Sequence, residues 1–394
     1  MAKRLAIPSK ELELRLVGGF DSFFASRIQR LAMNTDIPTT VIDELGNNEH
    51  AGTVTDTPNI TLTFSAFDVG VKVFSVLTGT DPAAYPGAGV DIENLGEIDA
   101  VIYVKDETLV QYVKSAHARR LQIRDFTFSY TVDGESTEDY TAIGSEKRWF
   151  KDEVFVERFT TGTTTFVLSQ SPTQLKNGDY CLTVLLDGGY LTEVAAGPAT
   201  GEYSVSGATI TTFDTRTAQV IAIYHQALAT AWAYVSDADS AIAIRGKDVD
   251  IKIGVNSMLR VQSVTINGTL NSTPVKEMGN PVVVGYQTQV PTVEGTVTVL
   301  DTDTDLIDLL VTGSIESGDT EFELTGTCVT VSGLSLEIIL KDPCDTDVIL
   351  KTVYVPEFRV VGDAYTSNVN ENATQTFNWQ SDTAQCIVFS GARV

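Results

Sequence analysis

The chain has 394 residues, of which 43% are hydrophobic and 20% charged, a composition that excludes a disordered, collagen-like or coiled-coil protein. Its 27 basic and 52 acidic residues give a formal net charge of −25, which excludes the basic surface that neutralises phosphates in nucleic-acid-binding proteins. The N-terminal apolar stretch is too short for a signal peptide, and no run approaches the roughly 18 apolar residues of a membrane helix, so we expect a soluble protein made in a cytoplasm, with no membrane partner.

Cysteine and histidine are too scattered for a disulfide scaffold or a zinc site. The four cysteines form no CxxC pair, and the three histidines lie far from them and from one another. The sequence also lacks a GxSxG elbow, a Walker A loop, a dinucleotide fingerprint and an HExxH motif. We therefore expect reduced thiols, no cofactor, no metal, no catalytic residues and no enzymatic activity.

The dominant pattern along the chain is that of antiparallel strands. Apolar residues alternate with Thr, Ser or charged residues in segments at 59–64, 165–168, 180–186, 203–205, 220–224 and 294–300. Hairpin turns are predicted at Asp133–Gly134, Asn177–Gly178, Asp187–Gly189, Ser206–Gly207 and Asn267–Gly268. The sequence therefore predicts an all-β protein.

One segment, 303–313, has the pattern of a short helix. An Asp or Thr caps its start, Leu306, Ile307, Leu309 and Leu310 form an apolar stripe, and Gly313 ends it. The preceding carboxylates at 301–305 resemble a calcium loop, but the Gly and Glu that such a loop needs at its sixth and twelfth positions are missing. We interpret these carboxylates as an acidic helix N-terminus, which the helix dipole favours.

The chain contains an internal repeat. At an offset of 233 residues, Arg27-Ile-Gln29 matches Arg260-Val-Gln262, and 42–47 matches 275–280 with Glu, Gly and Asn in the same order. Thr78–Gly79 matches Thr312–Gly313 after one inserted position, so a second short helix is predicted before Thr78. The offset reaches 236 at 102–106 and 237 at 132–140, a drift of only four residues.

The match then breaks and resumes at an offset of 145, where 236–246 is aligned with 381–391. The difference corresponds to an insertion of 92 residues, long enough for a small β-sandwich. We expect a first repeat at 1–147 with 236–250, an inserted β-sandwich at 148–235, and a second repeat at 251–394.

Each repeat resembles the tail tube, or major tail, protein of tailed bacteriophages. The resemblance rests on Leu259–Ile266, Val275–Asn280, Gly295–Leu300, the helix before Thr312–Gly313, and the closing strands 350–359 and 373–379. It implies two tandem β-sandwich or barrel repeats, each with one short helix. In the two-copy form of this family, trimeric rings with pseudo-sixfold geometry stack into a tube, and an insertion decorates its outside.

The resemblance implies partners and a location. The chain would pair with itself, and its acidic channel would conduct viral double-stranded DNA during ejection without binding it specifically. A tape measure protein would occupy the lumen, and tail terminator and tail tip proteins would close the tube. The chain would lie in the virion tail, of the non-contractile type, and in the host cytoplasm during assembly.

Two groups of residues are candidates for assembly contacts. The long, polar connections 34–58 and 267–291 predict arms that reach the neighbouring ring, with contacts from Glu44, Gly46, Asn47, Glu277, Gly279 and Asn280. The second group, for contacts between subunits, comprises Arg27, Arg260, Lys114, Arg119 and Arg120. For the arginines at 27 and 260, a salt bridge within each repeat is the alternative, and His117, which lies in the basic segment 114–120, is an alternative ligand site.

A second functional class also fits an all-β chain with an insertion. The protein could be a multi-domain adhesin or surface-binding protein that recognises a glycan or receptor through residues 148–235. The missing export signal argues against this alternative, as does the position of the repeat matches in scaffold segments.

Overall fold

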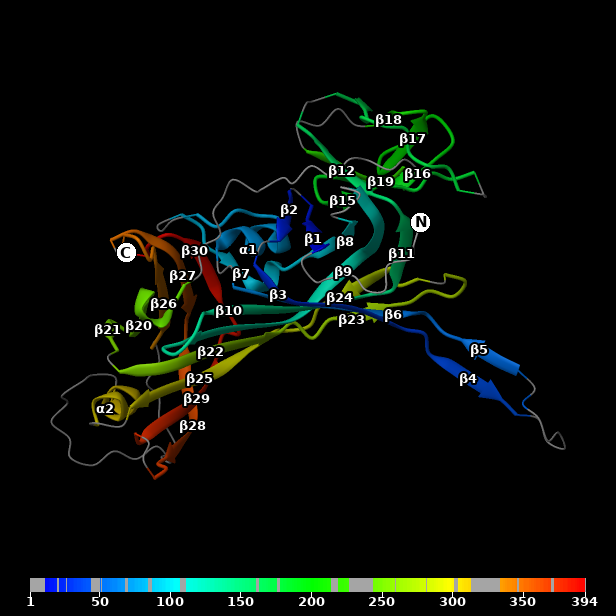
Figure 1. The fold of residues 1–394 in the computed structure, drawn as a ribbon. Helices are drawn as coiled ribbons and strands as arrows, with labels where there is room; N and C mark the ends of the chain where they lie inside the picture. Colours follow the sequence, from blue (N-terminus) through cyan, green and yellow to red (C-terminus); the bar gives the residue numbers. More distant parts are fainter. Residues whose placement is uncertain are drawn as a thin grey trace.

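The structure, a computed structural model, is all-β with short helices (Figure 1). It describes residues 11–19, 21–25, 27–43, 50, 52–67, 70–83, 87–106, 111–160, 163–175, 178–213, 219–226, 244–258, 260–280, 282–300, 304–312, 334–345, 347–369 and 372–393. We call residues 11–151 with 244–248 the first half, 249–393 the second half and 154–225 the inserted domain. The predicted fold class, all-β with an inserted β-sandwich, is confirmed.

One antiparallel sheet runs through both halves, and we call it the central sheet. Along the sheet its strands are β3 (Ile28–Asp36), β6 (Asn59–Ala66), β10 (Thr137–Gly144), β9 (Gln111–Thr131), β22 (Val261–Thr269), β25 (Thr292–Leu300), β29 (Thr374–Ser381) and β28 (Phe358–Thr366). Their sequences alternate apolar and polar residues, so one face is buried and the other is polar.

Each half adds a smaller layer of strands. In the first half, β2 (Ser22–Ala25), β1 (Leu12–Val17), β8 (Glu97–Asp106) and the start of β9 pair in that order, and β11 (Glu146–Lys151) lies on the other side of β9. The second-half layer has the order β21 (Asn256–Ser257), β20 (Val249–Ile253), β26 (Leu336–Lys341), β27 (Ile349–Val355), β30 (Ile387–Ser390) and β7 (Val90–Asp91). Because β7 comes from the first half, the two halves are joined in this layer as well.

Both predicted helices are present, α1 (Val71–Thr78) and α2 (Asp305–Thr312), and each follows the second strand of its half in the central sheet. Gly79 ends α1 with a φ of 68°, a left-handed conformation that glycine adopts without strain. Two 3-10 turns, η2 (Ile92–Asn94) and η3 (Gly246–Asp248), lead into later strands.

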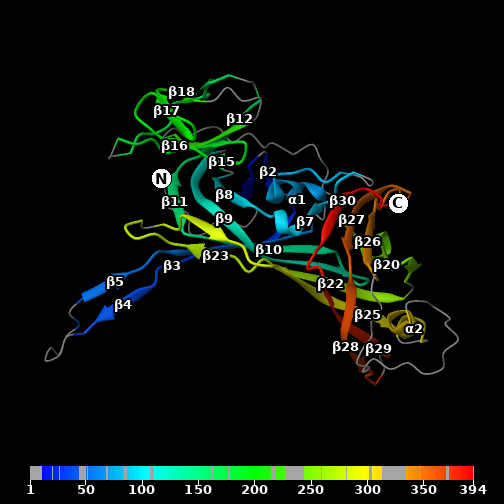
Figure 2. The same ribbon diagram turned by 180° about the vertical axis from the view of Figure 1, so that it is seen from behind.

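Two exposed hairpins leave the central sheet on the same side (Figures 1 and 2). They are formed by β4 (Thr39–Ile42) with β5 (Gly52–Thr55), and by β23 (Thr273–Val275) with β24 (Gly285–Gln287). Four antiparallel steps separate β3 from β22, so these two strands run in the same direction and their hairpins leave the same edge.

The inserted domain is a sandwich of two four-stranded sheets. One holds β12 (Val154–Phe159), β19 (Val220–His225), β14 (Leu182–Leu186) and β15 (Gly189–Tyr190). The other holds β13 (Thr165–Val167), β18 (Thr209–Thr212), β17 (Glu202–Ser206) and β16 (Thr192–Glu193). Its own apolar core includes Phe166, Val184, Ile210 and Ala222, as expected for an independent sandwich.

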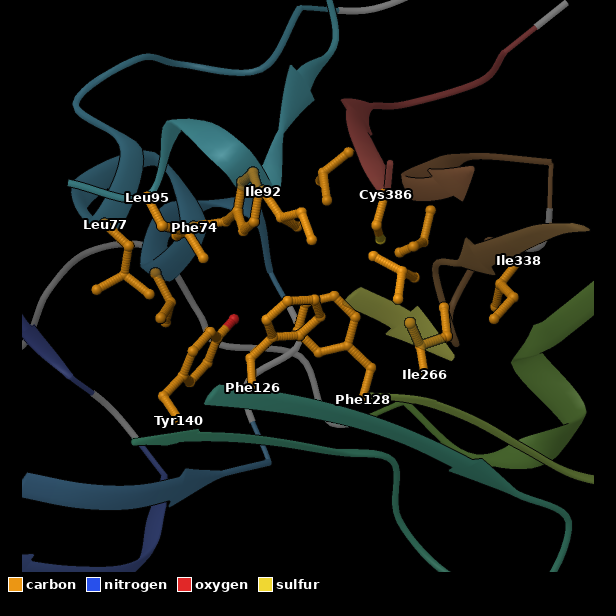
Figure 3. Packing of buried hydrophobic residues seen from close by; sticks show 14 of the residues in the cluster. Phe74, Leu77, Ile92, Leu95, Phe126, Phe128, Tyr140, Ile266, Ile338 and Cys386 are labelled. Atoms are coloured by element: carbon orange, nitrogen blue, oxygen red, sulfur yellow. The ribbon is translucent and has the colours of Figure 1, made fainter. Parts of the chain in front are cut away.

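A single apolar core extends across the two halves (Figure 3). Phe74 and Leu77 of α1 and Phe128 of β9 belong to the same cluster as Ile266 of β22 and Cys386 beside β30. Complete burial of one large apolar side chain contributes roughly 1.5–3 kcal/mol. The halves therefore stabilise each other.

Two details differ from the sequence prediction. Asn267–Gly268 is not a turn but lies inside β22, where a Cβ on Gly268 would come within 1.9 Å of the Phe126 ring. Gly268 is thus required by close packing. The predicted start of the insertion at 148 falls within β11, which pairs with β9, so the sandwich itself begins at β12.

Candidate functional site

The junction of the two halves in the central sheet is the pairing of β9 with β22. Seven consecutive residue pairs join them, from Ser263 opposite Thr131 to Thr269 opposite Asp125. β9 is 21 residues long, so its first part pairs with β8 and β11 while its last part pairs with β10 and β22. The junction is therefore a strand-to-strand contact continuous with each half.

The first two central strands of each half match in detail. Arg27 and Arg260 both adopt positive φ, 52° and 62°. Their carbonyls accept hydrogen bonds from the amides of Phe67 and Leu300, at 3.2 and 3.1 Å. A shift of pairing follows each arginine, between Ile28 and Arg30 and between Val261 and Ser263. Arg27 and Arg260 thus occupy corresponding bulges, 233 residues apart.

The last two central strands of each half match as well. Arg120, within β9, and Glu357, just before β28, are 237 residues apart and have φ values of 49° and 48°. The pairing shifts between Thr141 and Ala142 against β9, and between Val360 and Gly362 against β29. By these matches β28 takes the place of the last part of β9, and β3 takes the place of β22.

The two ends of the central sheet are strand edges. Among the described residues, β3 pairs only with β6 and β28 only with β29. Large apolar side chains on and beside β28 are exposed, with Val361 at 56% and Tyr365 at 60%. An unpaired edge with apolar side chains is a template for pairing with another chain. Inside the chain, β9 and β22 pair with each other. The corresponding strands β28 and β3 have no such partner among the described residues.

The polar face of the central sheet is rich in hydroxyl groups. Across strands, the Thr265 and Thr296 hydroxyls lie 2.8 Å apart and those of Thr298 and Thr376 lie 3.0 Å apart. Charged side chains on this face include Asp125 opposite Thr141 and Asp139 opposite Thr127, and also Glu294 and Arg359, which both lie opposite Gln380. The face is hydroxyl-rich with scattered charges.

Three of the six predicted arm residues lie on the β23–β24 hairpin. Glu277, Gly279 and Asn280 lie in the turn between β23 and β24, where Gly279 has a φ of 86° and the Asn280 amide donates to the Glu277 carbonyl at 3.2 Å. Glu44, Gly46 and Asn47 lie outside the described residues. The neighbouring Met278 is fully exposed, and Lys276 forms an ion pair with Asp56 at 3.3 Å.

Three predicted interface residues lie on β9. Arg119 forms an ion pair with Glu146 at 2.7 Å, and the Arg120 guanidinium lies 4.6 Å from the Tyr190 ring centre in the inserted domain. These two arginines therefore make contacts within the chain. Lys114 is exposed, and its ammonium lies 3.9 Å from the centre of the Trp149 ring on β11.

The inserted domain is fastened to the first half through buried Asp99. His117 Nε2 lies 2.8 Å and the Tyr190 hydroxyl 2.5 Å from its two carboxylate oxygens, and the Arg120 amide donates to it at 3.0 Å. Burial acts to raise the pKa of Asp99, but the hydrogen bonds from His117 and Tyr190 and the nearby positive charges outweigh it, so the pKa is lowered. His117 thus has a structural partner.

A buried ion pair, missed by the sequence analysis, lies at the junction of the halves. Lys351 of β27 pairs with Glu138 of β10, both fully buried, and its ammonium lies 4.9 Å from the centre of the Phe128 ring. The Tyr140 hydroxyl donates to the other Glu138 oxygen at 2.7 Å. The sequence signal that could have drawn attention to Lys351 is the repeat offset of 237, which aligns it with Lys114.

No family model matches the chain, and no curated protein sequence matches it significantly. The described residues hold no cluster of three or more His, Cys, Asp or Glu side chains able to bind a metal ion. In that same part of the chain, every helix is too short or too polar to cross a membrane.

Proposed function

We propose that this chain is a structural subunit of a bacteriophage tail tube, assembling head to tail into rings that stack around a channel for viral DNA. The observation that carries the proposal is the β9–β22 junction, whose two strand positions recur as the open edges β28 and β3. A surface on one side of a subunit thus matches a different surface on the other side, which is the condition for a head-to-tail contact.

The register of the contact between subunits follows from the junction inside the chain. Adding 237 to residue numbers in the last part of β9 gives the matching residues of β28, and subtracting 233 from those of β22 gives the matching residues of β3. Ser129 opposite Thr265 then becomes Thr366 opposite Ala32 of the next copy. Likewise, Thr127 opposite Asn267 becomes Ala364 opposite Asn34.

Closure into a ring removes both open edges, whereas an unclosed series of contacts would give a filament. Three copies would present six similar halves, in keeping with the pseudo-sixfold rings of the two-copy tail tube proteins that the sequence resembles. The hydroxyl-rich face would line the channel, because the opposite face is buried in the core. Its carboxylates would repel DNA phosphates within a Debye length of about 10 Å.

The test is negative-stain electron microscopy of the purified protein over a range of concentrations. We expect hollow rings or tubes whose end-on views resemble sixfold objects and contain three copies. A protein that stays monomeric at every concentration, and binds a glycan or receptor through the inserted domain, would contradict the proposal and favour the adhesin alternative.

A further inference from the structure

The Lys351 site shows how the second half contacts the first inside one chain. Lys351 reaches across the junction from β27 to Glu138 on β10, under the ring of Phe128 on β9. The carboxylate, the aromatic ring and the lysine therefore come from strands on both sides of one junction. A buried lysine requires such a partner, because an uncompensated ammonium in the core is costly.

The corresponding positions of the other half lie on or next to the open edges, with different residue types. At the offset of 237, Lys351 corresponds to Lys114, Phe128 to Tyr365 and Glu138 to Gln375. Glutamine replaces the carboxylate, but Gln375 Nε2 donates to the carboxylate of Asp363 at 3.1 Å. Tyr365 and Asp363 are both exposed on β28. A negative charge and an aromatic ring thus remain at the matching place, two residues apart on one strand.

On the lysine side of this open junction, Lys114 and Lys147 form no ion pair with a carboxylate of the described residues. Both lie against the Trp149 ring, at 3.9 and 4.9 Å from its centre. Partial burial and the positive charge of Lys114 lower the pKa of Lys147. Exposed Lys114 and half-buried Lys147 therefore lie together beside β3, where the Lys147 ammonium donates to the Met33 carbonyl at 3.2 Å.

We propose that Lys114 of one copy enters the site formed by Asp363, Tyr365 and Gln375 of the next copy. This inference rests on the ring of the proposed function, and it names the charged contact that joins its subunits. The cation lies on the β3 side of the chain and the carboxylate on the β28 side. Contact between two β3 sides or between two β28 sides would bring like charges together. The Lys114–Asp363 pair therefore favours head-to-tail contact over head-to-head contact.

The experiment is a charge swap read out by assembly. Lys114→Glu and Asp363→Lys each place like charges across the junction, and we expect each to raise the concentration needed for ring formation at least about tenfold. The double variant K114E/D363K restores opposite charges and should assemble close to the wild-type concentration. Sedimentation velocity measures assembly, and denaturant unfolding checks that each variant is folded.

Arg158→Glu is the matched control, because it makes the same change of charge as Lys114→Glu on β12 of the inserted domain, where Arg158 pairs with Asp21 at 3.0 Å and with neither open edge strand. It should assemble like the wild type. Single variants that are folded and assemble at the wild-type concentration would overturn the Lys114 contact while leaving the ring intact, as would a folded double variant that fails to recover. A wild-type protein that never assembles would instead count against the proposed function itself.

Discussion

Arg27, Arg120, Arg260 and Glu357 adopt left-handed backbone conformations at two pairs of matching positions. Such conformations are uncommon for residues with a Cβ, and they are found at bulges and turns. The repeat offset of 233 pairs Arg27 with Arg260, but the backbone conformation of these residues is not predictable from sequence, because arginine carries no preference for positive φ. The feature that the two halves share is a backbone conformation, which an alignment of residue types does not reveal.

The buried Lys351–Glu138 pair gives a stability prediction at the residue scale. Lys351→Met leaves the Glu138 carboxylate buried beside Tyr140, so we expect a loss of about 3–5 kcal/mol in the free energy of unfolding. The double variant K351M/E138Q removes both charges and should lose much less. Denaturant unfolding of both variants measures this difference, and an equal loss in the two would contradict the assignment.

Asp99 gives a prediction about pH. Its pKa is lowered in the folded state from the ordinary value of 3.8, chiefly because hydrogen bonds to its charged form outweigh burial. Its contribution to stability is therefore complete above pH 3.8 and is lost as the pH falls through the lowered pKa. Thermal unfolding of wild-type protein and Asp99→Asn should differ most near neutral pH and converge in acid. A constant difference down to the most acid pH would refute this linkage.

Elements with strong local signals were predictable from sequence, and elements fixed by packing were not. The helix at 305–312 followed from its apolar stripe and was confirmed. Asn267–Gly268 has the local chemistry of a hairpin turn, yet Phe126 of the neighbouring strand packs over Gly268 and the strand continues. The repeat offsets align 236–246 with 381–391, which contains β30. In the structure, however, the strand of the first half that corresponds to β30 is β11. Phe150 of β11 lies opposite Ser115, just as Phe389 of β30 lies opposite Thr352.

The inserted domain gives a prediction about excision. Replacing residues 154–225 by a short Gly/Ser linker retains β11 and both edges, so rings should still form. The monomer should be less stable, because Val101, Tyr103 and Tyr112 lose their cover and the Tyr103 hydroxyl loses the Val154 carbonyl at 2.7 Å. Unfolding and microscopy of the deletion check both parts. A folded deletion variant without rings would place the inserted domain in the contact between subunits.

The β4–β5 hairpin gives a prediction about stacking. The Asp56 amide donates to the Pro38 carbonyl at 2.9 Å, so a tight turn can replace residues 39–55 without disturbing β3 or β6. We expect folded protein that forms single rings and no tubes, because the hairpin contributes exposed surface and little core. Tubes of normal length from this variant, seen by negative-stain microscopy, would contradict the arm assignment.

At the scale of the whole molecule, the central claim is that one junction is used twice, once inside the chain and once between chains. The sequence predicted the repeat and the insertion, since both are visible as offsets. It did not predict which strands lie at the edges, because strand order depends on pairing between distant segments. The edges β3 and β28 became identifiable only from the order of the sheet.

The most direct test of this claim is disulfide cross-linking between copies. In the expected register Ala32 lies opposite Thr366 of the next copy, and directly opposite residues have Cα atoms about 4.5–5.5 Å apart, within reach of a disulfide. With the exposed Cys344 and with Cys328 replaced by serine, oxidised A32C/T366C should yield a covalent species of three chains. The control A32C/A364C is two residues out of register and should stay monomeric on a denaturing gel. Equal cross-linking of both variants, or none in A32C/T366C while rings form, would contradict the shared junction.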